Sequence, residues 1–152
     1  MMNLLLGIGN PFRRDDGAGN YVAASFRAPG WRAADCGTAP ENFTGLVRRQ
    51  HPDLLVLVDA ADMGLAPGEF AVIPKERIRD VGIGTHQLPL DILIGFVEDS
   101  AGAIIVIGIQ PKVVDTGEGL SPKVQEGADR LIRVLEQGEI GAVPLLGEEP
   151  EA

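Results

Sequence analysis

The sequence has a single cysteine, Cys36, among its 152 residues. An internal disulfide is therefore impossible, and a cysteine-rich metal centre cannot be built. Basic residues are also scarce, with 13 Lys and Arg against 22 Asp and Glu and a net charge of −9. This charge would repel phosphate backbones and anionic lipid surfaces, so we expect neither nucleic acid nor membrane insertion.

Long hydrophobic runs are missing as well. The first apolar run, Leu4–Ile8, has no basic leader and stops at Gly9-Asn10-Pro11, well short of a signal peptide or a membrane span. Together with the lone cysteine, this predicts a cytoplasmic protein.

The composition predicts a single domain. With 45% hydrophobic residues, the chain is long enough for one sizeable core and too short for two. The sequence from residue 138 onward holds four glutamates and has no clear periodicity. We therefore expect an α/β domain over residues 1–137 and an acidic, flexible tail over residues 138–152.

Continuous apolar runs, rather than alternating ones, indicate strands that are covered on both faces of a parallel sheet. Three such runs are Leu4–Ile8, Leu54–Val58 and Ile104–Ile107, and weaker strands are expected at residues 31–35 and 69–73. Segments with helical character alternate with them, at residues 17–26, 42–50, 88–97 and 124–135. This order predicts a three-layer α/β/α sandwich around a mostly parallel, twisted sheet of about five strands.

In open α/β sheets, ligands bind beyond the carboxyl ends of the strands. The first apolar run leads into a glycine-rich loop that contains Asp15 and Asp16. Simple capping of the following helix is one interpretation of this acidic pair. A dinucleotide-binding loop is another, but Phe12 replaces its third glycine and two carboxylates would face the phosphates.

Two further strand ends carry polar residues. Asp59 is predicted to close the second central strand, where a buried carboxylate needs hydrogen bonds or a cation, whereas Asp62 is interpreted as a capping residue. His86 lies between Gly84 and a predicted helix, whereas His51 beside Pro52 is interpreted as a surface residue.

Asp16, Asp59 and His86 together form a mixed oxygen and nitrogen ligand set, which suits a borderline divalent transition metal and leaves open positions for substrate or water. The rival chemistry is nucleophilic catalysis, which needs a serine or cysteine beside a histidine. The sequence has no G-x-S-x-G motif, and Cys36 is interpreted as a small buried residue. The serines considered stand in unremarkable contexts: Ser25, Ser100 and Ser121.

The same residues belong to a series of motifs between residue 4 and about residue 135. The motifs are Gly7-Ile8-Gly9-Asn10 with Asp15-Asp16-Gly17-Ala18-Gly19, Ala39-Pro40-Glu41-Asn42, Val58 to Leu65 with Pro67-Gly68-Glu69, Thr85 to Leu90, and Gly108-Ile109-Gln110-Pro111. In composition and order, this series resembles the hydrogenase maturation proteases. Within that family it most resembles the branch that processes the large subunit of the formate-hydrogenlyase hydrogenase.

The resemblance implies that Asp16, Asp59 and His86 occupy the metal-binding and catalytic positions of the family. It also implies an endopeptidase that recognises a [NiFe] hydrogenase large-subunit precursor after nickel insertion and removes a short C-terminal extension. Nickel would be presented by the substrate, and no organic cofactor is expected. The alternative is a non-catalytic nickel-sensing or metal-escort protein with the same three ligands.

Asp16 is the first choice for a general base, but a metal that polarises the scissile carbonyl would serve equally well. Arg13 and Arg14 stand where relatives often carry a small residue such as glycine. Either arginine could contact an acidic substrate segment or alter the acidity of the neighbouring carboxylates, and a solvated loop charge is the simpler interpretation.

Overall fold

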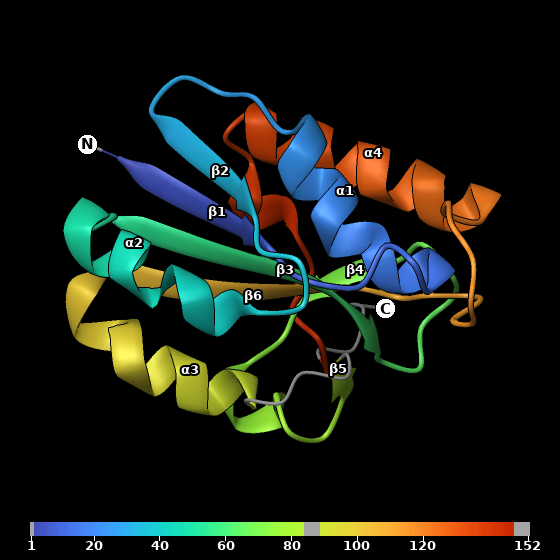
Figure 1. The fold of residues 1–152 in the computed structure, drawn as a ribbon. Coiled ribbons are helices and arrows are strands. Elements are labelled where there is room, and N and C mark those ends of the chain that lie inside the picture. Colours follow the sequence, from blue (N-terminus) through green and yellow to red (C-terminus); the bar gives the residue numbers. More distant parts are fainter. Residues whose placement is uncertain (1, 84–88, 148–152) are drawn as a thin grey trace.

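The structure is a computed structural model that describes residues 2–83 and 89–147. It is the predicted three-layer sandwich, with helices on both faces of one sheet (Figure 1). The main path of the sheet has the order β2-β1-β3-β6-β4, and the short β5 pairs with β3 beside this path. The strands are β1 (Asn3–Gly7), β2 (Trp31–Asp35), β3 (Leu54–Asp62), β4 (Phe70–Val72), β5 (Gly82–Ile83) and β6 (Ala103–Ile109).

The three apolar runs are the three interior strands, as predicted. β1, β3 and β6 lie side by side and parallel, and β2 extends the parallel set. β4 and β5 are antiparallel additions. Neighbouring residues of a strand point to opposite faces, yet Leu4, Leu5, Leu55 and Val56 are all fully buried. Cover on both faces explains why these strands are continuously apolar.

The helices divide the core into two halves. α1 (Ala18–Ser25) and α4 (Pro122–Glu136) cover one face of the sheet, and α2 (Thr44–Gln50) and α3 (Leu90–Val97) cover the other (Figure 1). α4 shows the local cause most clearly, since its buried apolar residues recur at helical spacing and leave its charged residues outside. These residues are Val124, Ala128, Leu131, Ile132 and Leu135.

A close approach between α1 and the strands places the loop that follows β1. A side-chain carbon at Gly19 would lie 2.2 Å from the Val58 carbonyl oxygen and 2.4 Å from that of Ile8. Only glycine lets the helix backbone sit this near the strand ends. The 3-10 turn η1 (Arg14–Gly17), which immediately precedes α1, is thereby held at the carboxyl edge of the sheet.

The packed domain continues past the predicted boundary at residue 137. The backbone N–H of Val72 donates to the Pro144 carbonyl (2.7 Å), and the N–H of Leu146 donates to the Val72 carbonyl (2.8 Å). Val143 and Leu146 are buried. Residues 138–147 therefore cover the outer edge of β4, and the prediction of a flexible tail is wrong for them. The segment shows no helix or strand periodicity, so its packing could not be predicted from the sequence pattern. Residues 148–152 lie outside the described residues.

None of the helices in residues 2–83 and 89–147 is both long and apolar enough to cross a bilayer.

Replacing Gly19 by alanine should lower the free energy of unfolding by about 1–3 kcal/mol, because the added methyl group collides with two strand carbonyls that cannot move apart. Gly95→Ala is the matched control, since a methyl group there meets nothing within 4 Å and alanine is the better helix former. Urea unfolding of both variants measures the difference. Equal stability of the two variants would contradict the proposed close approach.

Candidate functional site

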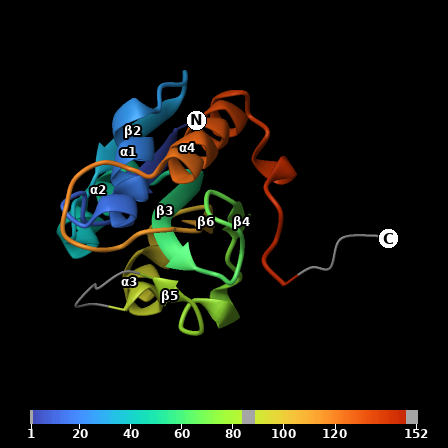
Figure 2. The ribbon, with the colours of Figure 1, turned by 90° about the vertical axis from the view of Figure 1, so that its right-hand side faces the viewer.

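The candidate site lies at the edge of the sheet toward which β1, β3 and β6 run. In Figure 2 this edge faces the viewer, and the segment between β6 and α4 crosses to the loop between β1 and α1. Backbone hydrogen bonds join the two segments, from Asp15 N–H to the Val113 carbonyl (3.0 Å) and from Arg14 N–H to the Gly117 carbonyl (3.0 Å).

Asp15 is the residue that locks these two segments together. Its carboxylate is fully buried and accepts backbone hydrogen bonds from Lys112 (3.0 Å), Val113 (2.8 Å) and Ser121 (2.7 Å), and a further one from the Ser121 hydroxyl. The interpretation of Asp15 as a simple helix cap is wrong, since all four donors belong to the distant segment between β6 and α4.

The environment of Asp15 favours its charged form. Burial alone would raise the pKa of this carboxyl group, but the hydrogen bonds from Ser121, Val113 and Lys112 together outweigh burial and hold the pKa below the ordinary value of 3.8. Asp15 is therefore a charged anchor at neutral pH.

Asp16 follows in the same tight loop and is only 5% exposed. Its carbonyl accepts from the Asn10 N–H (3.1 Å), and its own N–H donates to the Arg13 carbonyl (3.2 Å). Gly9 is required beneath it, since a side chain there would lie 2.1 Å from the Asp16 carbonyl oxygen. Both the loop hydrogen bonds and the Asp15 anchor thus fix the position of Asp16.

Asp59 lies inside β3 and is 1% exposed. The strand was predicted to end at this residue, but it continues to Asp62 because β6 pairs with it as far as Ala60 and β5 pairs with its last two residues. Strand alternation puts the Asp59 side chain on the face of Leu57, which α2 and α3 cover. Since η1 packs against β3, Asp16 and Asp59 share one edge of the sheet.

The third residue of the predicted ligand set, His86, lies outside the described residues. Within residues 2–83 and 89–147, no three His, Cys, Asp or Glu side chains are grouped so that they could hold a metal ion. His51, in contrast, is exposed and ends α2 with a left-handed backbone, as expected for a surface residue.

Gln110 is a positioning residue that sequence reasoning did not single out. Its side-chain oxygen accepts from the N–H groups of Met63 (2.7 Å) and Leu65 (3.2 Å), and its amide nitrogen donates to Asp62 (3.2 Å). Gln110 therefore holds the loop after β3. The available signal was its place in the Gly108-Ile109-Gln110-Pro111 block, directly after an interior strand.

The residues considered for nucleophilic catalysis do not form a catalytic pair in the described part of the chain. Burial, reinforced by the neighbouring Asp35 carboxylate, raises the pKa of the Cys36 thiol to about 12. The thiolate form that attacks a carbonyl is thus suppressed. Ser121 has a structural contact, contrary to its unremarkable sequence context, because its hydroxyl donates to Asp15.

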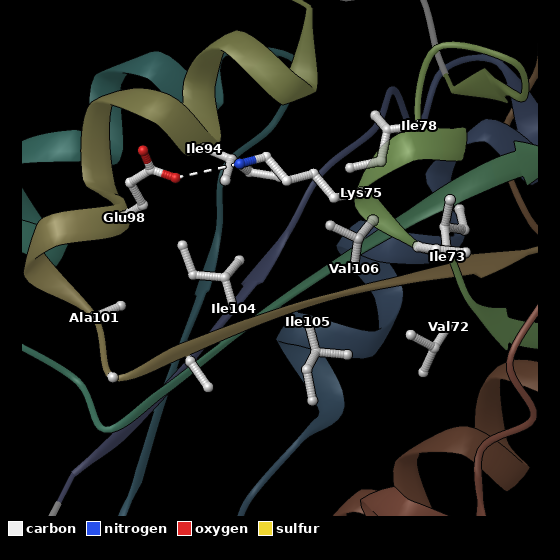
Figure 3. Close-up of a pocket in the computed structure, with 13 residues that line it drawn as sticks. Val72, Ile73, Lys75, Ile78, Ile94, Glu98, Ala101, Ile104, Ile105 and Val106 are labelled. Carbon is white, nitrogen blue, oxygen red and sulfur yellow. Dashed lines mark hydrogen bonds and ion pairs between the residues drawn. The ribbon is translucent and has the colours of Figure 1, made fainter.

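A separate apolar cavity of about 350 Å³ lies at the other end of the sheet (Figure 3). Ile104 and Val106 of β6 face Ile94 across it, and an ion pair between Lys75 and Glu98 (3.4 Å) lies beside it. It is lined by the first half of β6, whereas Asp59 pairs with Gly108 in the last half. This cavity is therefore distinct from the candidate site.

Comparisons with known proteins decide the family. The family model described as hydrogenase maturation protease matches residues 19–138. The hydrogenase 3 maturation protease of Escherichia coli K12 is 35% identical over 155 residues, which cover 98% of this chain and 99% of that protein. The chain belongs to the hydrogenase maturation protease family. It is an endopeptidase of this class, and the alternative of a non-catalytic metal escort gains no support.

Solved structures of hydrogenase maturation proteases share the whole fold. The solution structure of an endopeptidase, HycI, from Escherichia coli covers 99% of this chain and 100% of its own, with a TM-score of 0.87 and 34% identity. A [NiFe] hydrogenase maturation protease from Thermococcus kodakarensis covers 91% of this chain and 92% of its own, with a TM-score of 0.80 and 31% identity. The predicted fold class is thereby confirmed.

Replacing Asp15 by asparagine should lower the free energy of unfolding at pH 7 by about 2–3 kcal/mol, because an amide donor would face buried N–H donors. The wild-type protein should also lose stability as the pH falls below the ordinary carboxyl pKa, since the folded-state pKa of Asp15 is lowered and the charged form stabilises the fold above it.

Urea unfolding between pH 7 and pH 3 measures both effects. The variant should lose less stability than the wild type over this range. Parallel pH curves for the two proteins would exclude Asp15 as the anchor.

Proposed function

We propose that this protein removes the C-terminal extension of a [NiFe] hydrogenase large-subunit precursor after nickel has been inserted. The observation that carries the proposal is the pair of nearly buried carboxylates, Asp16 and Asp59, which a rigid loop and an interior strand hold at one edge of the sheet. The name of the Escherichia coli relative supports a hydrogenase 3-type substrate, the formate-hydrogenlyase branch.

Recognition of nickel would use Asp16, Asp59 and His86. Carboxylate and imidazole groups suit a borderline divalent metal, and nickel would arrive as part of the precursor rather than as a resident cofactor. Asp16 and Asp59 are both buried, so a metal that they bind in the precursor would be shielded from bulk water. The scissile peptide would be positioned only when nickel is present.

Hydrolysis would follow with Asp16 as the general base. Asp16 would accept a proton from a water molecule as the water oxygen bonds to the scissile carbonyl carbon. The carbon–nitrogen bond then breaks, and the proton passes to the departing amine. The products are the shortened subunit with a new C-terminal carboxylate and a released peptide, so the reaction needs no additional reactant. This scheme would make the enzyme an aspartyl-type peptidase.

Asp16→Asn should retain the fold and lower the rate of precursor cleavage by at least about 100-fold, because the amide cannot accept the proton at neutral pH. Asp99→Asn is the matched control, since Asp99 is exposed on the 3-10 turn between α3 and the start of β6. Mass spectrometry of a nickel-loaded precursor follows the loss of the C-terminal peptide. Normal processing by Asp16→Asn would exclude Asp16 as the base.

A further inference from the structure

The loop Asn10–Arg14, here called the arginine loop, is built more rigidly than its exposed position requires. Arg14 has a left-handed backbone with φ of 53°, which residues other than glycine rarely adopt. Two hydrogen bonds with Gly117 hold it there, from Arg14 N–H to the Gly117 carbonyl (3.0 Å) and from Gly117 N–H to the Phe12 carbonyl (2.9 Å). Backbone strain of this kind is retained where the side chain has a function.

One guanidinium nitrogen of each arginine in this loop lacks an acceptor. The Nε atoms of Arg13 and Arg14 are buried, and neither has a hydrogen-bond partner in the described part of the chain. Neither arginine takes part in the ion pairs found among the described residues. Both arginines are half-exposed, so their outer guanidinium nitrogens can reach solvent or a ligand while the Nε atoms lie inside. Buried Nε–H donors without acceptors are suited to a ligand that supplies an acceptor.

Arg14 also lines a cavity of about 320 Å³ beside the candidate site. Its aliphatic stem packs on Gly117, where a side-chain carbon would lie 3.2 Å from the Arg14 Cδ. Asp35 lines the same cavity, but it accepts from the Asn20 amide (2.7 Å) and the Gly37 N–H (2.9 Å) and makes no ion pair with Arg14. No salt bridge among the described residues therefore occupies the Arg14 guanidinium.

The guanidinium groups and the net charge of the protein indicate which ligand this loop binds. Planar guanidinium forks bind carboxylates through paired hydrogen bonds. The protein carries a net charge of −9, so an acidic peptide would be repelled elsewhere on the surface and attracted only at a cationic point. Phe12, which is 66% exposed in the same loop, adds an apolar contact next to the two cations.

We propose that the arginine loop binds a carboxylate of the precursor's C-terminal segment, and that Arg13 and Arg14 thereby select the precursor that Asp16 and Asp59 process. This inference rests on the proposed function. It assigns a specificity site to Arg13 and Arg14, which directly precede Asp15 and Asp16 in the sequence. The carboxylate belongs either to an acidic side chain or to the chain terminus, and the experiment separates the two sources.

The kinetic test compares Arg14→Gln with Arg32→Gln, a matched control at an exposed position of β2. For cleavage of the nickel-loaded precursor, Arg14→Gln should raise KM about 10-fold to 100-fold with kcat nearly unchanged, as expected for loss of a charge-assisted hydrogen-bond pair. Arg14→Lys should raise KM by a smaller factor than Arg14→Gln, because lysine keeps the charge but not the paired hydrogen bonds. An unchanged KM for Arg14→Gln would overturn the proposal.

Changes in the precursor identify the carboxylate. Acidic side chains of its C-terminal segment are replaced by their amides in one series, and its terminal carboxylate is converted to an amide in another. One of these changes should weaken binding to the wild type by the same factor as Arg14→Gln and have little further effect on that variant. Fully additive losses in both series would contradict direct contact.

A binding measurement separates failure of this inference from failure of the proposed function. The affinity of the precursor for Asp16→Asn is measured by calorimetry, with and without Arg14→Gln. If the wild type cleaves nothing but Arg14→Gln still weakens binding, the loop binds the precursor and the proposed function fails. If cleavage occurs and affinity is independent of Arg14, the proposed function stands and this inference fails. Absence of binding would overturn both.

Discussion

The buried carboxylate of Asp15 is the constraint on which the candidate site depends. It accepts hydrogen bonds from Lys112, Val113 and Ser121 and so fastens the loop after β1 to the segment after β6. A charged group without these donors would not remain in the interior. Asp16 on one side and Arg14 on the other take their positions from this anchor, which turns a glycine-rich loop into a rigid support.

The parallel sheet supplies the second half of the arrangement. β1, β3 and β6 run in one direction, so groups from distant parts of the sequence meet where these strands end. Asp59 extends from β3 and Gln110 follows β6, while η1 follows β1. The proposed mechanism uses no nucleophilic side chain, because the carboxylates at this strand edge would hold a metal-bearing substrate and accept a proton from water.

The interior of the fold was predictable because local pattern determines it. The continuous apolar runs predicted the three central strands, and the helical character of residues 124–135 predicted α4. The extension of β3 beyond Asp59 was not predictable, since it depends on pairing with β5. The segment after residue 138 was misjudged because Val143 and Leu146 pack without periodicity.

The site was predictable only in part. Asp16 and Asp59 follow from strand ends and from the family resemblance, and the structure brings both to one edge. The role of Asp15 depends on donors that are 97 to 106 residues away, which no local motif reveals. The left-handed backbone of Arg14 likewise results from contacts with Gly117. The place of His86 in the ligand set stays a prediction.

The central claim is that the strand-edge carboxylates act on a precursor only after nickel has been inserted. It is tested most directly by mixing the protein with nickel-loaded and with nickel-free large-subunit precursor and following the mass of each. The account predicts loss of a C-terminal peptide from the loaded precursor alone. Cleavage of both precursors at equal rates would contradict nickel recognition by Asp16 and Asp59, and cleavage of neither would contradict the assignment of this precursor as the substrate.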